Sequence, residues 1–231
     1  MPQNHIVNSQ KMLSTDRDSR SKDLRESGRF WLEFQLKCFC DLFVSSMVLV
    51  LISPVLLLIS LLIKLDSPGP IFHKQYRVGL KGRQFYMWKF RTMVPNAIEL
   101  QQELEPENHA SGGVLFKIPD DPRITRVGKF LRRYSLDELP QIINVLQKDM
   151  SIVGPRPLVL RDVDRMPEEL FFRHDVLPGI TGLWQVKGRS SLSSEEIFNW
   201  DSIYIDRWSI SLDLNILWQT IGVVLKGDGA Y

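Results

Sequence analysis

The stretch LFVSSMVLVLISPVLLLISLLI, residues 42–63, decides how this chain folds. It contains no charged residue, and as a straight α-helix rising about 1.5 Å per residue it would just cross a bilayer core about 30 Å thick. The run is too long and begins too late for a secretory signal, and no small-residue cleavage site follows it. We therefore expect a membrane helix rather than a buried helix of a soluble domain.

Two features bear on whether this helix crosses the membrane. Ser53-Pro54 lies in its middle, where proline removes a backbone hydrogen bond and bends a helix. Basic residues flank the run on both sides, so the positive-inside rule holds both ends on the cytoplasmic face. These residues are Arg20, Lys22, Arg25, Arg29 and Lys37 before the run, and Lys64, Lys74, Arg77, Lys81 and Arg83 after it. A re-entrant helix that breaks at Ser53-Pro54 satisfies both features, and a kinked spanning helix is the alternative that they leave open.

The remaining composition suits one domain with appendages. The chain has 231 residues and a net charge of +2, so its charge does not call for nucleic acid. Residues 1–34 are polar and mixed in charge, and we expect them to be disordered. Cys38 and Cys40 are the only cysteines and fit neither a disulfide framework nor a zinc site, so we expect both to be reduced. The expected organisation is a polar extension over residues 1–34, a membrane helix over 35–64 and a mixed α/β domain over 65–231.

Turn residues and apolar spacing predict the elements of the mixed domain. Ser67-Pro68-Gly69-Pro70 should stop the membrane helix. Two strand-like runs follow at residues 71–76 and 84–90, joined through glycines. Helices are expected over residues 97–104, 139–146 and 212–225. Trp200, Trp208 and Trp218 lie close to apolar helical spacing, which leaves a place at the membrane interface and a place in the core equally open.

Charged residues gather in the segment RRYSLDELPQ, residues 132–141. Ser135 and Glu138 fit a capping box at a helix N-terminus, and Pro140 is tolerated only in the first turn of that helix. The free N–H groups of such a helix start, together with Arg132 and Arg133 just upstream, suit a phosphate. A carboxylate there would repel phosphate unless it acts as a nucleophile or holds a divalent cation. Taken alone, the segment is more typical of ordinary helix capping.

Further cations stand on stiff loops or at a strand end. They are Arg156 between two prolines, Arg189 after Gly188, and Lys89 and Arg91 on either side of Phe90. Together these cations suit a polyanionic substrate. Asp162-Val163-Asp164 imitates the metal motif of nucleotide-sugar glycosyltransferases, although so short a match carries little information. The chain has neither a P-loop nor a dinucleotide-binding fingerprint.

Four longer motifs follow one another in a specific order. They are KFRTM at residues 89–93, SLDELPQ at 135–141, DMSIVGPRP at 149–157 and PGITGLWQVKGR at 178–189. With them, residues 35–231 resemble the bacterial sugar transferases. These are the monotopic phosphoglycosyl transferases that begin capsule, exopolysaccharide, O-antigen and glycoprotein glycan synthesis.

The resemblance implies a compact, membrane-associated α/β catalytic domain with interfacial amphipathic helices and a re-entrant helix broken at Ser53-Pro54. It implies a catalytic dyad, Asp137-Glu138, in which Asp137 is the nucleophile and a ligand of Mg²⁺. Phosphate or nucleotide would be bound by Arg132, Arg156 and Arg189, with Lys89 and Arg91 as further candidates.

The expected reaction has two steps at the cytoplasmic face of the bacterial inner membrane. Asp137 attacks the β-phosphorus of a UDP-sugar and UMP leaves; polyprenyl (undecaprenyl) phosphate then displaces the aspartyl phosphosugar. Glu138 either acts as a general base or orients Asp137. Two rivals are a glycosyltransferase that uses Asp162 and Asp164 and releases UDP, and a catalytically inactive scaffold. The sequence specifies neither the sugar nor whether the chain forms a homodimer, and we expect no nucleic-acid partner.

Overall fold

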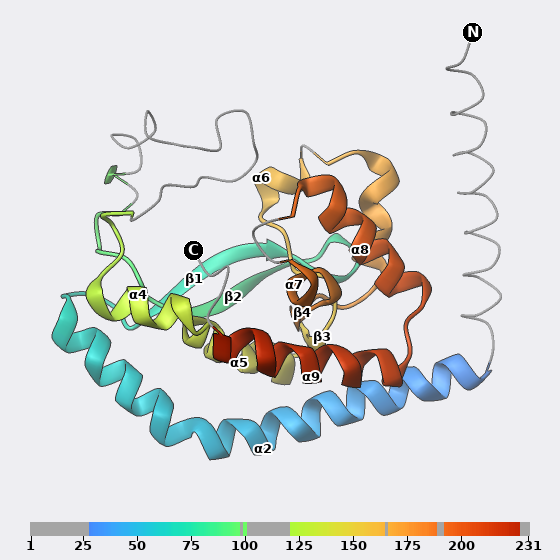
Figure 1. Cartoon of the computed structure of the whole chain (residues 1–231), viewed down its shortest axis with the longest axis horizontal. Helices are drawn as coiled ribbons and strands as arrows, with labels where there is room; N and C mark the ends of the chain where they lie inside the picture. The colour runs from blue at the N-terminus through green and yellow to red at the C-terminus, as the bar shows by residue number, and fades with distance from the viewer. Residues whose placement is uncertain (1–27, 98, 101–120, 165, 189–191, 227–231) are drawn as a thin grey trace, which may run out of the picture. The chain divides into compact units, whose positions relative to one another are not determined.

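A computed structural model of the chain describes residues 28–97, 99–100, 121–164, 166–188 and 192–226. Arg189 and most of the helix predicted over residues 97–104 lie outside this part of the chain. The chain divides into two units, Met1–Cys40 and Asp41–Tyr231. The described residues form one helix long and apolar enough to cross a membrane, two small sheets and several shorter helices (Figure 1). The domain is therefore mixed α/β, as expected.

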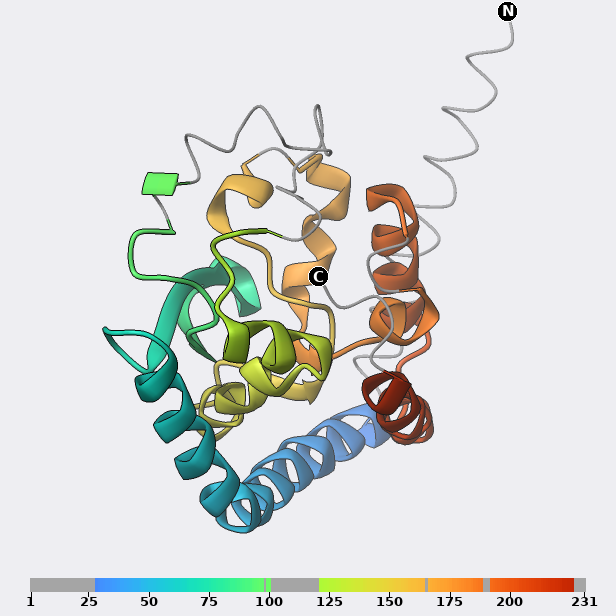
Figure 2. The same ribbon diagram turned by 60° about the vertical axis from the view of Figure 1, so that its left-hand side comes forward.

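The long apolar helix, α2 (Gly28–Asp66), begins earlier than composition suggested and ends directly before Ser67-Pro68, as predicted. In its part beyond residue 40 it bends near the middle, where Pro54 lies (Figures 1 and 2). Pro54 has no N–H to donate to the carbonyl of Val50, four residues earlier. The Ser53 hydroxyl donates to that carbonyl instead, at 2.8 Å. The Ser-Pro pair thus bends the helix and satisfies the oxygen that the bend leaves free.

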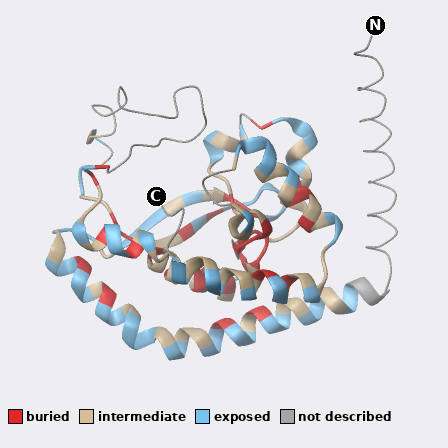
Figure 3. Cartoon of the chain, in the orientation of Figure 1, coloured by how far each residue is buried: buried red, intermediate tan, exposed pale blue. Residues whose placement is uncertain are grey.

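The buried residues of α2 form two groups, one on each side of the bend (Figure 3). Asp41 and Ser45 are buried before it, and Ile59 and Ile63 are buried after it. No residue from 46 to 58 is buried. Each arm of the helix therefore packs on the domain by the end away from the bend, and the bend itself is uncovered.

Strands β1 (Phe72–Val78) and β2 (Gln84–Phe90) form an antiparallel hairpin close to the two predicted strands. The short turn η1 (Leu80–Gly82) joins them. Alternation along β2 turns Phe85, Met87 and Lys89 to one face, and the first two pack on an apolar cluster with Val145 and Met150. Lys89 thereby reaches the candidate site from the same face of the sheet.

Strands β3 (Ser151–Val153) and β4 (Gly179–Thr181) pair in parallel. Their backbones approach so closely just after β3 that only glycine fits. A Cβ on Gly179 would lie 2.1 Å from the Gly154 nitrogen, and one on Gly154 would lie 2.5 Å from the Leu177 oxygen. This crossing fixes the start of the loop that carries Arg156.

Further helices in the described part of the chain lie between these strands or after them. They are α4 (Arg126–Arg133), η3 (Leu136–Gln141), α5 (Ile142–Leu146), α6 (Leu160–Val163), η4 (Glu168–Asp175), α7 (Leu183–Lys187), α8 (Ser194–Asp206) and α9 (Ile210–Lys226). The helix predicted over residues 212–225 is confirmed as α9.

The three C-terminal tryptophans divide between core and surface. Trp200 and Trp208 pack against a buried cluster that includes Tyr204 and Ile216. Trp218 is 78% exposed on α9. Its exposed apolar neighbours along this helix are Leu214, Ile221 and Leu225. Of these three tryptophans, only Trp218 is exposed enough to insert into a membrane interface.

Candidate active site

The segment predicted to begin a capped α-helix has a different structure. Residues Leu136–Gln141 form the 3₁₀ helix η3, and Ser135 before it is left-handed, with φ 54° and no capping bond from its side chain. The capping-box prediction is wrong because the Glu138 carboxylate is bound by cations from distant parts of the chain. A 3₁₀ helix this short offers little dipole, so recognition of an anion here depends on side chains.

Two cations hold the Glu138 carboxylate. Lys89 Nζ donates to Oε1 at 2.7 Å. Arg156 donates from Nη1 to Oε2 at 3.1 Å and from Nη2 to Oε1. Burial alone would raise the pKa of Glu138, but Arg156 and Lys89 outweigh it and the pKa is lowered. Glu138 is therefore held ionised, and a carboxylate of such low pKa is a weak base.

The neighbouring carboxylate, Asp137, is in the opposite situation. Its residue is only 8% exposed. Across the ranges that the structure describes, no donor forms a hydrogen bond or ion pair with its oxygens. The pKa of Asp137 is raised, mainly by burial. The charge of Lys89 opposes this rise, and the charge of Glu138 adds to it. Of the two adjacent carboxylates, Glu138 is bound by Lys89 and Arg156, whereas the oxygens of Asp137 accept no hydrogen bond from the described residues.

Arg132 stands near Asp137 and is held by Thr92. Its Nε donates to the Thr92 hydroxyl at 2.9 Å. Burial lowers the pKa of Arg132, and the charge of Asp137 opposes that effect. Helix α4 passes so close to this threonine that a Cβ on Gly128 would lie 2.1 Å from the Thr92 oxygen. Backbone contact therefore fixes the position of Thr92 and, through it, Arg132.

The hairpin contributes Arg77 and His73, which sequence reasoning missed. Arg77 Nη1 donates to the carbonyl of Pro157 at 3.0 Å. Burial, followed by the charge of Arg156, lowers the pKa of Arg77 to about 10. His73 pairs with Lys89 across the hairpin, and burial and Lys89 lower its pKa. The sequence could have indicated both residues, because alternation and the hairpin register place residues 73 and 77 on the same face of the sheet as Lys89.

Arg91 lies apart from this cluster. Its Nη1 donates to the carbonyl of Pro68 at 2.8 Å, and its Nη2 donates to the carbonyl and the hydroxyl of Ser67 at 2.7 and 2.9 Å. Arg91 lies one residue after the end of β2 at Phe90, and its guanidinium holds the turn that follows α2. Arg189, the remaining candidate cation, is outside the described residues.

The described cluster brings four cations close to two adjacent carboxylates, with a third carboxylate, Asp162, near Arg77. The cations are Arg77, Lys89, Arg132 and Arg156, and the two adjacent carboxylates are Asp137 and Glu138. The excess positive charge suits an anion with several charges, such as a diphosphate. An anion held by these cations would lie beside the available oxygens of Asp137.

The donor set also fits a magnesium ion. No three His, Cys, Asp or Glu side chains within the described ranges are grouped to hold a metal by themselves. Mg²⁺ commonly takes only one or two protein carboxylates, with substrate phosphate oxygens and water completing its shell. Asp137 fits that role because no described donor occupies its oxygens. Glu138 does not, since its oxygens already face Lys89 and Arg156.

Comparison with known proteins identifies the family. The described residues form a mixed α/β domain with a long apolar helix and a pair of carboxylates lined by cations. Residues 32–227 match the family model described as bacterial sugar transferase. The chain belongs to the bacterial sugar transferase family, as its motifs suggested.

Several relatives are about 40% identical to this chain over the aligned residues. The undecaprenyl-phosphate galactose phosphotransferase of Salmonella typhimurium is 41% identical over 210 residues, which are 90% of this chain and 43% of that protein. The UDP-glucose:undecaprenyl-phosphate glucose-1-phosphate transferase of Klebsiella pneumoniae is 41% identical over 199 residues, 83% of this chain and 40% of that protein. The exopolysaccharide production protein ExoY of Rhizobium meliloti is 38% identical over 194 residues, 83% of this chain and 86% of that protein. The chain thus spans about two fifths of the length of the first two relatives and most of the third.

Proposed function

We propose that this protein is a phosphoglycosyl transferase that moves a sugar-1-phosphate from a UDP-sugar to polyprenyl phosphate and releases UMP. This transfer would be the first membrane step in the synthesis of an exopolysaccharide, a capsule or an O-antigen-type glycan. The names of the Salmonella and Klebsiella relatives support the two substrates, and that of the Rhizobium relative supports the pathway.

The division of labour between Asp137 and Glu138 carries this proposal. Asp137 Oδ attacks the β-phosphorus of the UDP-sugar, a bond forms between them, and the phosphoanhydride bond to UMP breaks. An oxygen of the lipid phosphate then attacks the same phosphorus, and the Asp137 carboxylate leaves. One difficult transfer becomes two easier ones, and both substrates are consumed without another reactant. A carboxylate tied up by cations, as Glu138 is, could not serve as this nucleophile.

The cations supply the electrostatic part of the mechanism. The pKa of Asp137 is raised by burial, and the charges of Lys89, Arg132 and Arg156 oppose that rise, so these cations would also act on a phosphoryl group bound to Asp137. Mg²⁺, held by Asp137 and substrate oxygens, would offset further phosphate charge when bound. Arg189 belongs to the matching motif, and its role stays a prediction.

We assign Glu138 an orienting role rather than that of a general base. Its pKa is lowered, so it would take up a proton poorly at neutral pH. Its carboxylate instead holds Lys89 and Arg156 at fixed distances from each other. These two cations then meet the substrate in a preset geometry.

The anchor is proposed to be re-entrant. Each arm of α2 is held to the domain by the end away from the bend, and the region between is apolar and uncovered. An arm of about ten residues is about 15 Å long, so the bend would reach only the middle of a bilayer core about 30 Å thick. Both ends and the catalytic domain would then lie at the cytoplasmic face of the inner membrane. The exposed apolar stripe of α9, with Trp218, suits the interface of the same leaflet.

Arg156→Lys should lower kcat/KM roughly tenfold or more, a loss of about 1.4 kcal/mol in transition-state stabilisation. Lysine keeps the charge but loses the fork that binds both oxygens of Glu138. Steady-state kinetics of UMP release measure the effect. Arg83→Lys, at an exposed position of the hairpin turn, is the control and should be neutral. Wild-type kinetics for Arg156→Lys would remove this arginine from the site.

The nucleotide released tests the proposal as a whole. Purified protein in detergent or nanodiscs is given UDP-galactose or UDP-glucose with undecaprenyl phosphate and Mg²⁺. We expect UMP and a lipid diphosphate sugar. Release of UDP would instead indicate the glycosyltransferase that uses Asp162 and Asp164, and no turnover with any UDP-sugar would indicate a scaffold.

A further inference from the structure

The loop Pro155–Leu158 carries Arg156, and two of its four residues are prolines without an N–H. Its backbone is therefore attached to the surrounding elements mainly through its carbonyl groups. Gly179 N donates to the carbonyl of Pro155, and Val78 N donates to the carbonyl of Leu158, both at 2.9 Å. These two bonds fix the loop on either side of Arg156. The two carbonyls between them face side chains.

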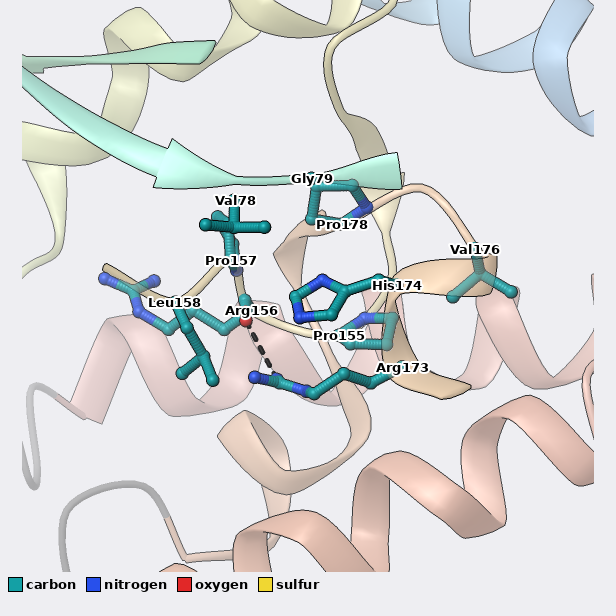
Figure 4. Close-up of a pocket in the computed structure, with 10 residues that line it drawn as sticks. All are labelled: Val78, Gly79, Pro155, Arg156, Pro157, Leu158, Arg173, His174, Val176 and Pro178. Atoms are coloured by element: carbon teal, nitrogen blue, oxygen red, sulfur yellow. Dashed lines mark hydrogen bonds between the residues drawn. The ribbon is translucent and has the colours of Figure 1, made fainter. Parts of the chain in front are cut away.

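Arginine side chains hold these two middle carbonyls. Arg77 holds the carbonyl of Pro157, as described above. Arg173 Nη2 donates to the carbonyl of Arg156 at 2.9 Å (Figure 4). The same nitrogen donates to Asp201 Oδ2 at 2.6 Å. Arg173, from η4, thus links the backbone of Arg156 to α8.

The Arg173–Asp201 pair is buried and closely surrounded. Both side chains are 2% exposed. The Phe198 ring lies against the guanidinium, with its centre 5.4 Å from Cζ. A small cavity of about 10 Å³ lies beside Arg173 and His174. Buried pairs are costly to desolvate and add little stability over apolar residues, so stability alone does not explain this one.

We propose that Arg173 and Asp201 are positioning residues for Arg156, an inference that rests on the proposed function. Asp201 fixes Arg173, whose Nη2 fixes the carbonyl of Arg156. The direction from which the Arg156 side chain approaches Glu138 is thereby set before substrate binds. Neither member of the pair forms a hydrogen bond or ion pair with Glu138 in the described residues, so the pair acts through Arg156.

Asp201→Asn is the test variant and Asp175→Asn is its matched control. Asparagine keeps the shape and one acceptor oxygen at position 201 but removes the charge that fixes Arg173. Asp175 lies two residues from Arg173 and forms an exposed pair with Lys81 at 2.6 Å. With UDP-galactose or UDP-glucose, undecaprenyl phosphate and Mg²⁺, Asp201→Asn should lower kcat/KM about tenfold, and Asp175→Asn should not change it.

The same change in an Arg156→Lys background separates positioning from stability. If the pair acts through Arg156, Asp201→Asn should cost less than about twofold there, while the unfolding midpoint shifts equally in both backgrounds. Arg173→Lys, whose ammonium ends one bond short of Nη2, should show the same non-additivity. All variants are assayed well below the unfolding midpoint of the least stable one.

The outcomes are distinguishable. Equal fold losses in the two backgrounds, or an unchanged kcat/KM for Asp201→Asn, with an active wild type would overturn the positioning role and leave the proposed function intact. A wild type that releases no UMP would overturn both.

Discussion

Asp137→Asn is expected to reduce transfer below detection, a loss of roughly 10⁴-fold or more, as when other covalent nucleophiles are removed. An amide is a poor nucleophile and a weaker Mg²⁺ ligand than a carboxylate. The variant should nevertheless be at least as stable as the wild type at pH 7. Burial raises the folded pKa of Asp137, so the folded protein holds its proton to higher pH than the unfolded chain does. Stability therefore falls as the pH rises from the pKa of Asp137 in the unfolded chain through its higher pKa in the folded protein. A neutral asparagine avoids this loss.

The covalent intermediate gives the same residue a direct test. Wild-type protein given a UDP-sugar without lipid should release up to about one equivalent of UMP and gain the mass of a sugar phosphate. The adduct should map to the peptide that contains Asp137, and steady-state kinetics should be ping-pong. Intact-protein mass spectrometry and UMP quantification measure both.

An exposed carboxylate provides the control for these experiments. Asp164→Asn, at the end of α6, should keep both the adduct and the UMP burst. If UMP appears only when lipid phosphate is present and the protein mass never shifts, direct transfer through a ternary complex is the better account.

The second large effect concerns the anchor. Replacing Ser53 and Pro54 by Ala and Leu should straighten α2 into a spanning helix and carry residues 1–41 across the membrane. Proline in a helix interior costs about 3 kcal/mol, and its removal restores the hydrogen bond to Val50. Accessibility labelling of an N-terminal tag in intact cells and spheroplasts measures the change.

A matched double variant controls for altered hydrophobicity. Val55→Leu with Ser60→Ala makes similar changes in the same helix but keeps Pro54, so the tag should stay cytoplasmic. A tag that is already periplasmic in the native protein would make the re-entrant proposal wrong. A tag that stays cytoplasmic in the straightened variant would mean that the polar contact of Asp41 with Ser151, at 2.6 Å, holds the first arm more strongly than the bend does.

The bend in α2 and the β1–β2 hairpin could be predicted because their causes are local. Pro54 acts on a carbonyl one turn away. The strands are set by their own alternation and by the glycines between them. The helix in the last part of the chain was likewise visible in its apolar spacing. None of these elements needs a distant partner to decide its form.

The geometry of the site could not be predicted, because distant partners decide it. Glu138 fits a local capping rule, but its carboxylate is taken by Arg156, 18 residues later, and Lys89, 49 residues earlier. Arg173 and Asp201 are 28 residues apart, and no motif joins them. Motif resemblance indicated which residues matter, while the contacts that assign them different tasks appear only in three dimensions.

The glycine contacts on both sides of the site have an evolutionary consequence. Gly128 touches the backbone at Thr92, and Gly154 touches the backbone near Gly179, so backbone contact sets the distances on the Arg132 side and on the Arg156 side. Side chains in a core can repack around a lost or added methyl group, but two backbones in contact cannot move closer. The apolar interior can therefore drift in sequence between relatives while the spacing of these two arginines stays the same.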